Sequence, residues 1–272
     1  MRSIRIGLVG AIAFLPAFAQ SSGTAPALDT AGKIAHRQHG PIRDWKDHFD
    51  GTSTSTNWSG YAVTGTSFTS ALGSWTVPTA TCKGVRGDQY SSFWVGIDGY
   101  SSSSVEQTGT DSDCVGTRAS YYAWYEFYPQ PSYEITSLTI HAGDRMSASV
   151  TYSGSKFTVT IIDETTGKSY SKSASVSSAK RTSAEWIAEA PCCTRGGGIL
   201  PMSDFGTVLF GEDTSGVSGT NYATSSTVSG PISDFGSAVQ EINKVGSSSS
   251  PQTSTCSAVS SDGTSFSCTW AP

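Results

Sequence analysis

Residues 121–128 of this 272-residue chain read Tyr-Tyr-Ala-Trp-Tyr-Glu-Phe-Tyr, and this run indicates the fold class. It is rich in aromatic residues, which favour strands over helices. Alternate residues of a strand point to the same side, so Glu126 shares a face with Tyr122, Trp124 and Tyr128. The run therefore predicts a β-strand that presents a carboxylate among aromatic rings.

The same period-two pattern continues from residue 57 onward, interrupted at short intervals by Gly, Ser, Asp and Pro. Further strands are predicted at residues 61–63, 73–77, 93–97, 138–140, 146–152, 157–162, 185–189 and 207–210. Residues 239–245 predict one short helical turn at most, and a Pro-x-Ser-Asp-Phe-Gly hexamer at 201–206 and 231–236 predicts two similar turns. Many short strands with regular turns predict an all-β sandwich or barrel.

Several polar side chains are expected on the outer face of this sheet. Trp94 and Asp98 point away from the apolar side of their strand, and Glu185 and Glu189 do the same in theirs. Carboxylates flanked by aromatic residues on an outer face are typical of a groove for an extended ligand. Solvated strand faces with incidental aromatic residues are the alternative interpretation.

Composition narrows the classes of function. Charged residues make up 14% of the chain, against about 25% in an average soluble protein. With 17 Lys and Arg against 22 Asp and Glu, a nucleic-acid binder is excluded, and so is a highly charged disordered chain. Without its first 50 residues the chain keeps 11 basic and 18 acidic residues. So few bases limit positive self-repulsion once carboxylates are protonated, which suits an acidic medium.

The N-terminus has the pattern of a signal peptide. Arg2 and Arg5 precede an apolar run at 6–18, and Ala17-Phe18-Ala19 predicts cleavage after Ala19. A membrane anchor is disfavoured because the run is shorter than the roughly 20 residues a spanning helix needs. We therefore expect a secreted protein.

Three further segments are predicted. Residues 20–56 carry three of the four histidines and are interpreted as a propeptide whose histidines charge as the pH falls; a disordered spacer is the alternative. Its end is expected within residues 50–56, and the main domain spans 57–245. Residues 246–272 are predicted to form a Ser-rich linker and a small hairpin clipped by cysteines.

The cysteines of an exported protein are expected to form disulfides. Their spacing lacks paired C-x-x-C units, so a zinc site is disfavoured. Cys256 and Cys268 lie symmetrically about the Asp262-Gly263 turn and are predicted to pair. The adjacent Cys192 and Cys193 are expected to bond to different partners; the remaining two cysteines, Cys82 and Cys114, are candidates.

The residue types present in the chain disfavour most catalytic systems. His141 is the single histidine of the main domain, and no G-x-S-x-G or HExxH motif is present, which disfavours a serine triad and a histidine-rich metal site. All six cysteines can pair, and the paired Asp-Thr-Gly motifs of aspartic proteases are absent. Carboxylate chemistry remains.

Five motifs in order resemble the glutamic peptidases, also called eqolisins. They are N-W-S-G-Y at 57–61, F-W-V-G-I-D-G at 93–99, E-Q-T-G at 106–109, A-W-Y-E-F-Y-P at 123–129 and A-E-W-I at 184–187. The resemblance covers most of residues 57–236 and leaves the tail from 246 outside. It implies an all-β, concanavalin-like double antiparallel-sheet β-sandwich and an acid endopeptidase.

The resemblance also implies site residues. A catalytic dyad falls on Gln107 and Glu185 by motif position: the glutamate takes a proton from water and returns it to the leaving amine, and the glutamine amide stabilises the oxyanion. The residues implied to support the dyad or bind substrate are Trp94, Asp98, Asp111, Glu126 and Glu189. Tyr122 stands where fungal members often have Asp, so one supporting carboxylate is missing or replaced.

We accordingly expect a monomeric enzyme that acts on polypeptides, with no cofactor, metal, nucleic-acid partner or membrane attachment after signal cleavage. Two alternatives remain on the same sandwich. One is a glycoside hydrolase with a carboxylate pair among Asp98, Asp111, Glu126 and Glu185. The other is a non-catalytic, lectin-like carbohydrate-binding module.

Overall fold

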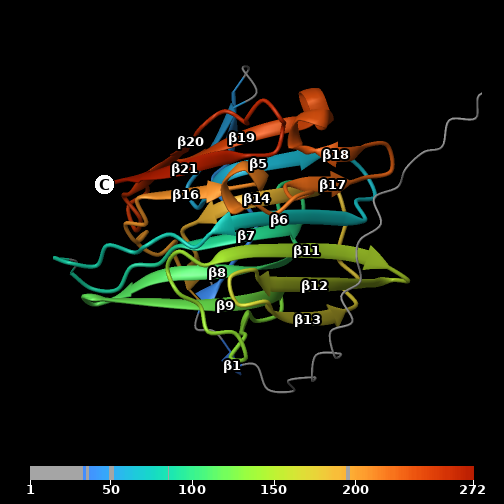
Figure 1. The fold of residues 1–272 in the computed structure, drawn as a ribbon. Helices are drawn as coiled ribbons and strands as arrows, with labels where there is room; N and C mark the ends of the chain where they lie inside the picture. The colour runs from blue at the N-terminus through green and yellow to red at the C-terminus, as the bar shows by residue number, and fades with distance from the viewer. Residues whose placement is uncertain (1–32, 35–36, 49–51, 85, 194–196) are drawn as a thin grey trace, which may run out of the picture.

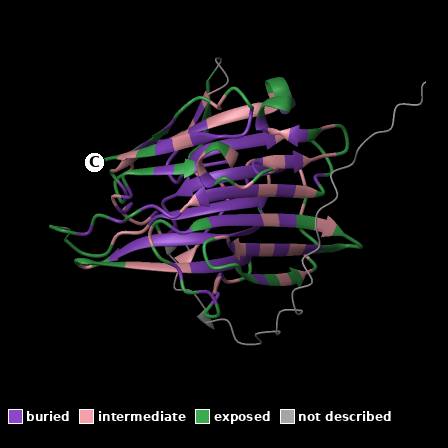
Figure 2. Cartoon of the chain, viewed as in Figure 1, coloured by how far each residue is buried: buried purple, intermediate pink, exposed green. Residues whose placement is uncertain are grey.

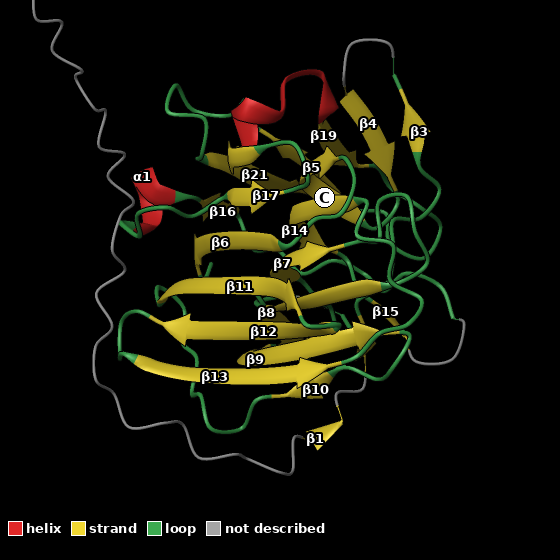
Figure 3. Cartoon of the chain, turned by 90° about the vertical axis from the view of Figure 1, so that its right-hand side faces the viewer, coloured by secondary structure: helices red, strands yellow, loops and turns green. Residues whose placement is uncertain are grey.

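The computed structural model describes residues 33–34, 37–48, 52–84, 86–193 and 197–272. Nearly all regular structure in these ranges is antiparallel sheet, and the strand ladders form two packed layers (Figures 1 and 3). The predicted all-β double-sheet sandwich is confirmed. The predicted signal peptide, residues 1–19, lies outside the described residues.

The first layer carries the motifs identified in the sequence. Its strands, in order of pairing, are β1 (Lys33–Ile34), β10 (Tyr133–Glu134), β9 (Arg118–Tyr128), β8 (Val105–Val115), β7 (Ser92–Ile97), β14 (Ser183–Glu189), β5 (Trp58–Thr64), β19 (Val239–Lys244), β4 (Thr52–Ser55) and β3 (Lys46–Asp47). All of these neighbours are antiparallel except β19 and β4.

The second layer is built around β6 (Ser70–Thr76). On one side β6 pairs with β11 (Arg145–Ser153), followed by β12 (Lys156–Asp163) and β13 (Lys168–Ala174). On the other side it pairs with β16 (Thr207–Phe210) and β17 (Tyr222–Thr224); these lead to β21 (Phe266–Ala271), β20 (Thr253–Cys256) and β18 (Ser229–Pro231). A separate ladder joins β2 (Arg37–Gln38) to β15 (Cys192–Cys193).

The main core fills the space between the layers, as the buried colouring of the central strands shows (Figure 2). Val95 and Ile97 of β7 and Trp186 and Ala188 of β14 belong to it, so the predicted inward faces are confirmed. Trp186 is fully buried, and its indole N–H donates to the Leu72 carbonyl at 2.7 Å, so this polar group does not lack a partner.

Three local predictions differ from the structure. Residues 138–140 form no strand, although Leu138 and Ile140 are buried, and His141 beyond them is exposed. Residues 239–244 form strand β19, because pairing with β5 and β4 outweighs a weak local helical pattern. The hexamer at 231–236 lies in a 3-10 helix (Ile232–Ala238), whereas the copy at 201–206 is irregular, so the two share a buried Phe and a positive-φ Gly but not one turn.

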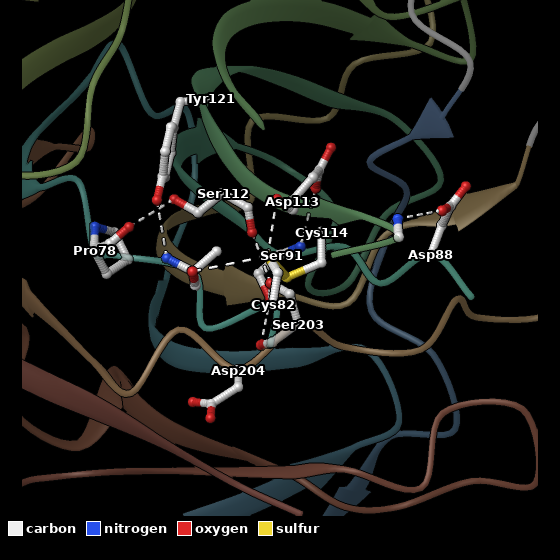
Figure 4. The surroundings of a disulfide bond; sticks show 12 residues. Pro78, Cys82, Asp88, Ser91, Ser112, Asp113, Cys114, Tyr121, Ser203 and Asp204 are labelled. Atoms are coloured by element: carbon white, nitrogen blue, oxygen red, sulfur yellow. Dashed lines mark hydrogen bonds between the residues drawn. A yellow bond between two sulfur atoms is a disulfide. The ribbon is translucent and has the colours of Figure 1, made fainter. Parts of the chain in front are cut away.

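Two disulfides are present among the described residues. Cys256 pairs with Cys268 across β20 and β21, as predicted. Cys82 pairs with Cys114, so the prediction that these two bond to Cys192 and Cys193 is wrong. The reason is a loop that returns along the end of β8, where the Gln89 N–H donates to the Cys114 carbonyl at 2.9 Å. Figure 4 shows the surroundings of the Cys82–Cys114 disulfide.

The C-terminal tail is part of the sandwich and not an appended hairpin. Strand β21 pairs with β16 of the second layer, and the Phe266 ring stacks on Phe210 with centroids 4.8 Å apart. Before it, the ammonium of the buried Lys244 donates to the Ser250 carbonyl at 3.2 Å and to the Gln252 carbonyl at 2.5 Å, which orders the predicted linker. Within the described ranges, helix α1 (Glu212–Ser215) and the 3-10 helix are short, and no helix has the length and apolarity to cross a membrane.

Candidate functional site

The predicted site residues lie on the outer face of the first layer, in cross-strand rows set by register. An aromatic row lies between two rows that carry acidic groups. The rows are Glu185–Gly96–Gln107–Glu126, Ile187–Trp94–Gly109–Trp124 and Glu189–Ser92–Asp111–Tyr122. This face also carries a small apolar cluster that includes Trp58, Trp94 and Trp124, so its polar groups sit against hydrophobic surface.

Gln107 is held in a defined orientation. Its side-chain Nε2 donates to Glu126 Oε2 at 3.2 Å and to the main-chain carbonyl of His39. The main-chain N–H of His39 donates to the same Glu126 oxygen at 2.9 Å. Gln107 is fully buried. The amide N–H of Gln107 therefore points at the carbonyl of a peptide group.

Glu189 lies on the other side of His39. Its Oε2 accepts a hydrogen bond from Trp94 Nε1 at 2.9 Å and lies 3.7 Å from His39 Nδ1, and its Oε1 accepts from Asn57 Nδ2 at 3.3 Å. Burial raises the pKa of the Glu189 carboxyl against the opposing contacts from His39, Trp94 and Asn57. Glu189 is thus a carboxyl group held by two donors beside the same residue that Gln107 contacts.

Glu126 completes this group. Burial raises the pKa of its carboxyl well above the usual value, although the His39 N–H opposes the rise, and the charge of Glu189 adds to it. Two neighbouring buried carboxyls of this kind favour a shared negative charge over two separate ones. Glu126 and Glu189 can therefore hold one proton between them.

Glu185 lies in different surroundings, although it shares a row with Gln107. The Trp94 ring occupies the space over Gly96 between them: a Cβ added to Gly96 would lie 2.9 Å from Trp94 Cζ3. Burial raises the pKa of Glu185 well above its usual value, and the charges of Asp98 and Glu106 add to the rise. Among the described residues no hydrogen bond joins Glu185 to Gln107; the two lie in one row, on either side of Gly96 and the Trp94 ring.

Asp98 has a role in the scaffold. Its carboxylate accepts main-chain hydrogen bonds from Lys180, Arg181 and Thr182 at 2.7–3.0 Å. Asp98 itself has a φ of 72°, so the chain turns sharply where β7 ends. It therefore anchors the loop that leads into β14.

Asp111 belongs to an acidic pocket that the sequence predicted only in part. Its carboxylate accepts from the Tyr122 hydroxyl at 2.6 Å and lies 3.8 Å from Arg37 Nε, and Arg37 also donates to Asp113. The Arg37 guanidinium lies over the Tyr90 ring, 4.2 Å from its centroid. Sequence analysis missed Asp113, although its spacing of two from Asp111 would have placed both carboxylates on one face.

The segment from residue 37 to residue 43 covers this face. The His39 ring stacks on Trp124 with centroids 3.6 Å apart, and the Pro41 carbonyl accepts from Asn57 Nδ2 at 3.2 Å. The Ile42 N–H donates to the Gly99 carbonyl at 3.1 Å. His39 is fully buried. The N-terminal segment singled out for its histidines thus lies in the site itself, which the sequence did not predict.

No group of three or more His, Cys, Asp or Glu side chains suited to a metal ion occurs in the described part of the chain. The residues around His39 offer an amide, two carboxyls and aromatic surface. This set can bind an extended peptide, donate to its carbonyl and exchange a proton beside it.

Comparisons with known proteins show the family of the chain. The model of the Peptidase A4 family matches residues 56–270 and so includes the tail that the sequence analysis left outside the resemblance. Aspergillopepsin-2 of Aspergillus niger is 32% identical over 186 residues, which are 60% of this chain and 65% of that protein. Scytalidopepsin B of Scytalidium lignicola is 37% identical over 138 residues, 49% of this chain and 51% of that protein. The matches thus span less than two thirds of either relative.

Solved structures give the same result. A crystal structure of scytalido-glutamic peptidase with a transition state analog inhibitor matches with a TM-score of 0.64 and 31% identity, over 79% of this chain and 98% of that chain. Aspergilloglutamic peptidase from Aspergillus niger matches with a TM-score of 0.53 and 29% identity, over 67% and 99%. The chain therefore belongs to the Peptidase A4 family, the glutamic peptidases that its five sequence motifs resemble.

Proposed function

We propose that this chain is a secreted acid endopeptidase in which Gln107 and Glu189 act directly on the peptide bond. The observation that supports this most is the position of His39, whose peptide carbonyl accepts from Gln107 while its ring lies 3.7 Å from Glu189. A polypeptide substrate would present its scissile carbonyl where the His39 carbonyl lies.

The chemistry follows from these contacts. Glu189, as a carboxylate, takes a proton from a water molecule whose oxygen attacks the carbonyl carbon. The carbonyl oxygen becomes an oxyanion that the Gln107 amide N–H stabilises. The protonated Glu189 then gives its proton to the leaving nitrogen as the C–N bond breaks. Glu126 is a positioning residue, because it accepts from the Gln107 amide and so keeps the N–H aimed at the carbonyl.

This assignment moves the base from Glu185, predicted by motif position, to Glu189. Both carboxyls are on the same face, but Glu189 contacts the residue bound by Gln107, whereas Glu185 lies beyond the Trp94 ring beside Asp98 and Glu106. No observation in the site favours the glycoside hydrolase or the lectin-like module.

Single substitutions test the assignment. Hydrolysis of a denatured protein at acidic pH should fall at least about 10²-fold in Glu189→Gln, which loses the base, and about 10²- to 10³-fold in Gln107→Ala, which loses the oxyanion donor. The matched control, Glu185→Gln, should keep most of its activity. The reverse result, with Glu185→Gln inactive and Glu189→Gln active, would restore the dyad predicted from the sequence. Activity in all three variants would refute the proposed function.

We further propose that residues 37–43 inhibit the enzyme until acid removes them. Arg37 is held by Asp113 and lies near Asp111, and protonation of Asp113 on acidification would weaken that attraction. Burial raises the pKa of Asp113 well above its usual value, and the charge of Asp111 adds to this against the opposing contact with Arg37, which favours protonation of Asp113.

The fold also indicates where the removed segment should end. Strand β4 (Thr52–Ser55) pairs with β19, and Ser53 and Ser55 are fully buried, so a cut after residue 55 would strip a strand from the first layer. We therefore expect the new N-terminus at or before Thr52, toward the start of the predicted 50–56 range. Mass spectrometry of protein secreted at neutral pH and then acidified measures it; full activity without any new N-terminus would refute the propeptide.

A further inference from the structure

The N-terminal segment touches the first layer at a second place, well before His39. Strand β1 pairs antiparallel with β10, with Lys33 opposite Glu134 and Ile34 opposite Tyr133. On its other side β10 pairs with β9. When β1 leaves, the side of β10 that it covers would become an edge able to pair with another strand.

The direction of the β10 main-chain groups can be worked out from its pairing with β9. The Ile135 N–H donates to the Ala123 carbonyl of that neighbouring segment at 2.8 Å. Main-chain groups of successive strand residues point to opposite sides, so Glu134 directs its N–H and carbonyl away from β9, toward Lys33. The Lys33–Glu134 pair is thus the hydrogen-bonded pair, and the Ile34 N–H points away from β10.

The spacing fits one continuous bound chain. Lys33 lies six positions before His39, a reach of about 20 Å when extended. The row that contains Gln107 lies two strands from β10, about 10 Å across the sheet. Between the two places, β2 pairs with β15, so main-chain pairing holds the segment along its course.

Resting on the proposed function, we propose that β10 is a substrate-binding edge in the mature enzyme. A polypeptide substrate pairs with β10 as an added strand, through the residue six positions before the scissile carbonyl. Lys33 has this position relative to His39. Recognition at this edge uses main-chain hydrogen bonds, so it selects extended, unfolded polypeptides at least seven residues long on this side and not a particular sequence.

Peptide length is the direct test. Acid-matured enzyme is given two quenched fluorescent peptides with the same scissile bond, one with three residues before it and one with seven. We expect the longer peptide to show a KM about five- to tenfold lower at similar kcat, the effect of two main-chain hydrogen bonds. Equal KM values would overturn the proposal, whereas failure to cleave either peptide would refute the peptidase activity instead.

N-methylation locates the contact. A methyl group on the nitrogen of the residue that matches Lys33 should raise the KM of the long peptide to that of the short one, because the N–H that it replaces faces Glu134. The same modification one residue later, at the position that matches Ile34, should leave the gain intact. Equal effects of the two modifications would overturn the register.

Enzyme variants give the complementary test. Glu134→Pro removes the N–H that faces the added strand and leaves Tyr133 and Ile135 to pair with β9. In this variant the KM of the long peptide should rise to that of the short one. The short peptide should be cleaved at the wild-type rate, which also shows that the variant is folded. Glu134→Ala keeps the N–H and should behave as wild type. Retention of the gain in Glu134→Pro would overturn the proposal.

Discussion

Glu106 should make the protein lose stability as the pH rises, and removing it should relieve much of that loss. The residue is fully buried and Asp98 lies nearby, while a contact with the Ser104 side chain opposes the rise of its pKa. Burial raises the pKa of Glu106 from 4.5 to about 9, and the charge of Asp98 adds to the rise. The folded state therefore holds a proton that the unfolded chain releases.

The size of the effect follows from proton linkage. The stabilisation is fully present below the unfolded pKa of 4.5 and is lost as the pH rises toward the folded pKa of about 9. Each pH unit in that window lowers the free energy of unfolding by about 1.4 kcal/mol for this one group. The loss at about pH 7 is then about 3 kcal/mol, a large part of the stability of a typical domain.

Urea unfolding of Glu106→Leu measures this. In a Gln107→Ala background that prevents self-cleavage, the variant should match its parent within about 1 kcal/mol near pH 4 and exceed it by about 3 kcal/mol near pH 7. Asp88→Asn, at an exposed carboxylate, is the control and should leave the pH dependence unchanged. A Glu106→Leu stability curve that runs parallel to its parent across this pH range would refute the reasoning.

Three further predictions concern the site and the tail. Arg37→Ala removes the contacts with the acidic pocket, so the pH of half-maximal processing should rise; an unchanged midpoint on gels would count against inhibition through Arg37. Trp94→Phe removes a hydrogen bond that lowers the pKa of Glu189, so the acidic limb of the kcat/KM profile should move to higher pH, and an unmoved limb would contradict the role of Glu189 as base. Replacing both Cys256 and Cys268 by Ala should lower the free energy of unfolding by about 2–3 kcal/mol for a loop of this length; an unchanged urea midpoint would show that pairing of β20 and β21 suffices.

Much of the fold was accessible from the sequence because period two reports directly on strand faces. The inward placement of Val95 and Trp186 and the outward placement of Trp94 and Glu126 followed from alternation alone. The Cys256–Cys268 pair followed from its symmetrical turn. These are local properties, set by residues a few positions apart.

The sequence did not predict the features that depend on pairing between distant segments. Strand β19 depends on β5 and β4, which lie more than 170 residues earlier in the chain, and local spacing gave it a helical turn. The Cys82–Cys114 disulfide depends on a loop that returns to the end of β8. The position of His39 between Gln107 and Glu189 also depends on contacts between segments far apart in the sequence. In each case the contact joins two distant segments, and the local sequence of neither segment predicts it.

The two glutamates of β14 show why this limit matters for function. Glu185 and Glu189 are four residues apart, so alternation places both on the outer face and cannot separate them. Motif position favoured the first, but the register with β7 sets Glu185 opposite Gly96 and Glu189 opposite Ser92. Because Gly96 has no side chain, the Trp94 ring lies over it, and this ring separates Glu185 from Gln107 while its N–H binds Glu189. The Trp94 indole thus separates Glu185 from Gln107 and orients Glu189. The proposed choice between the two glutamates as base therefore depends on the position of Trp94.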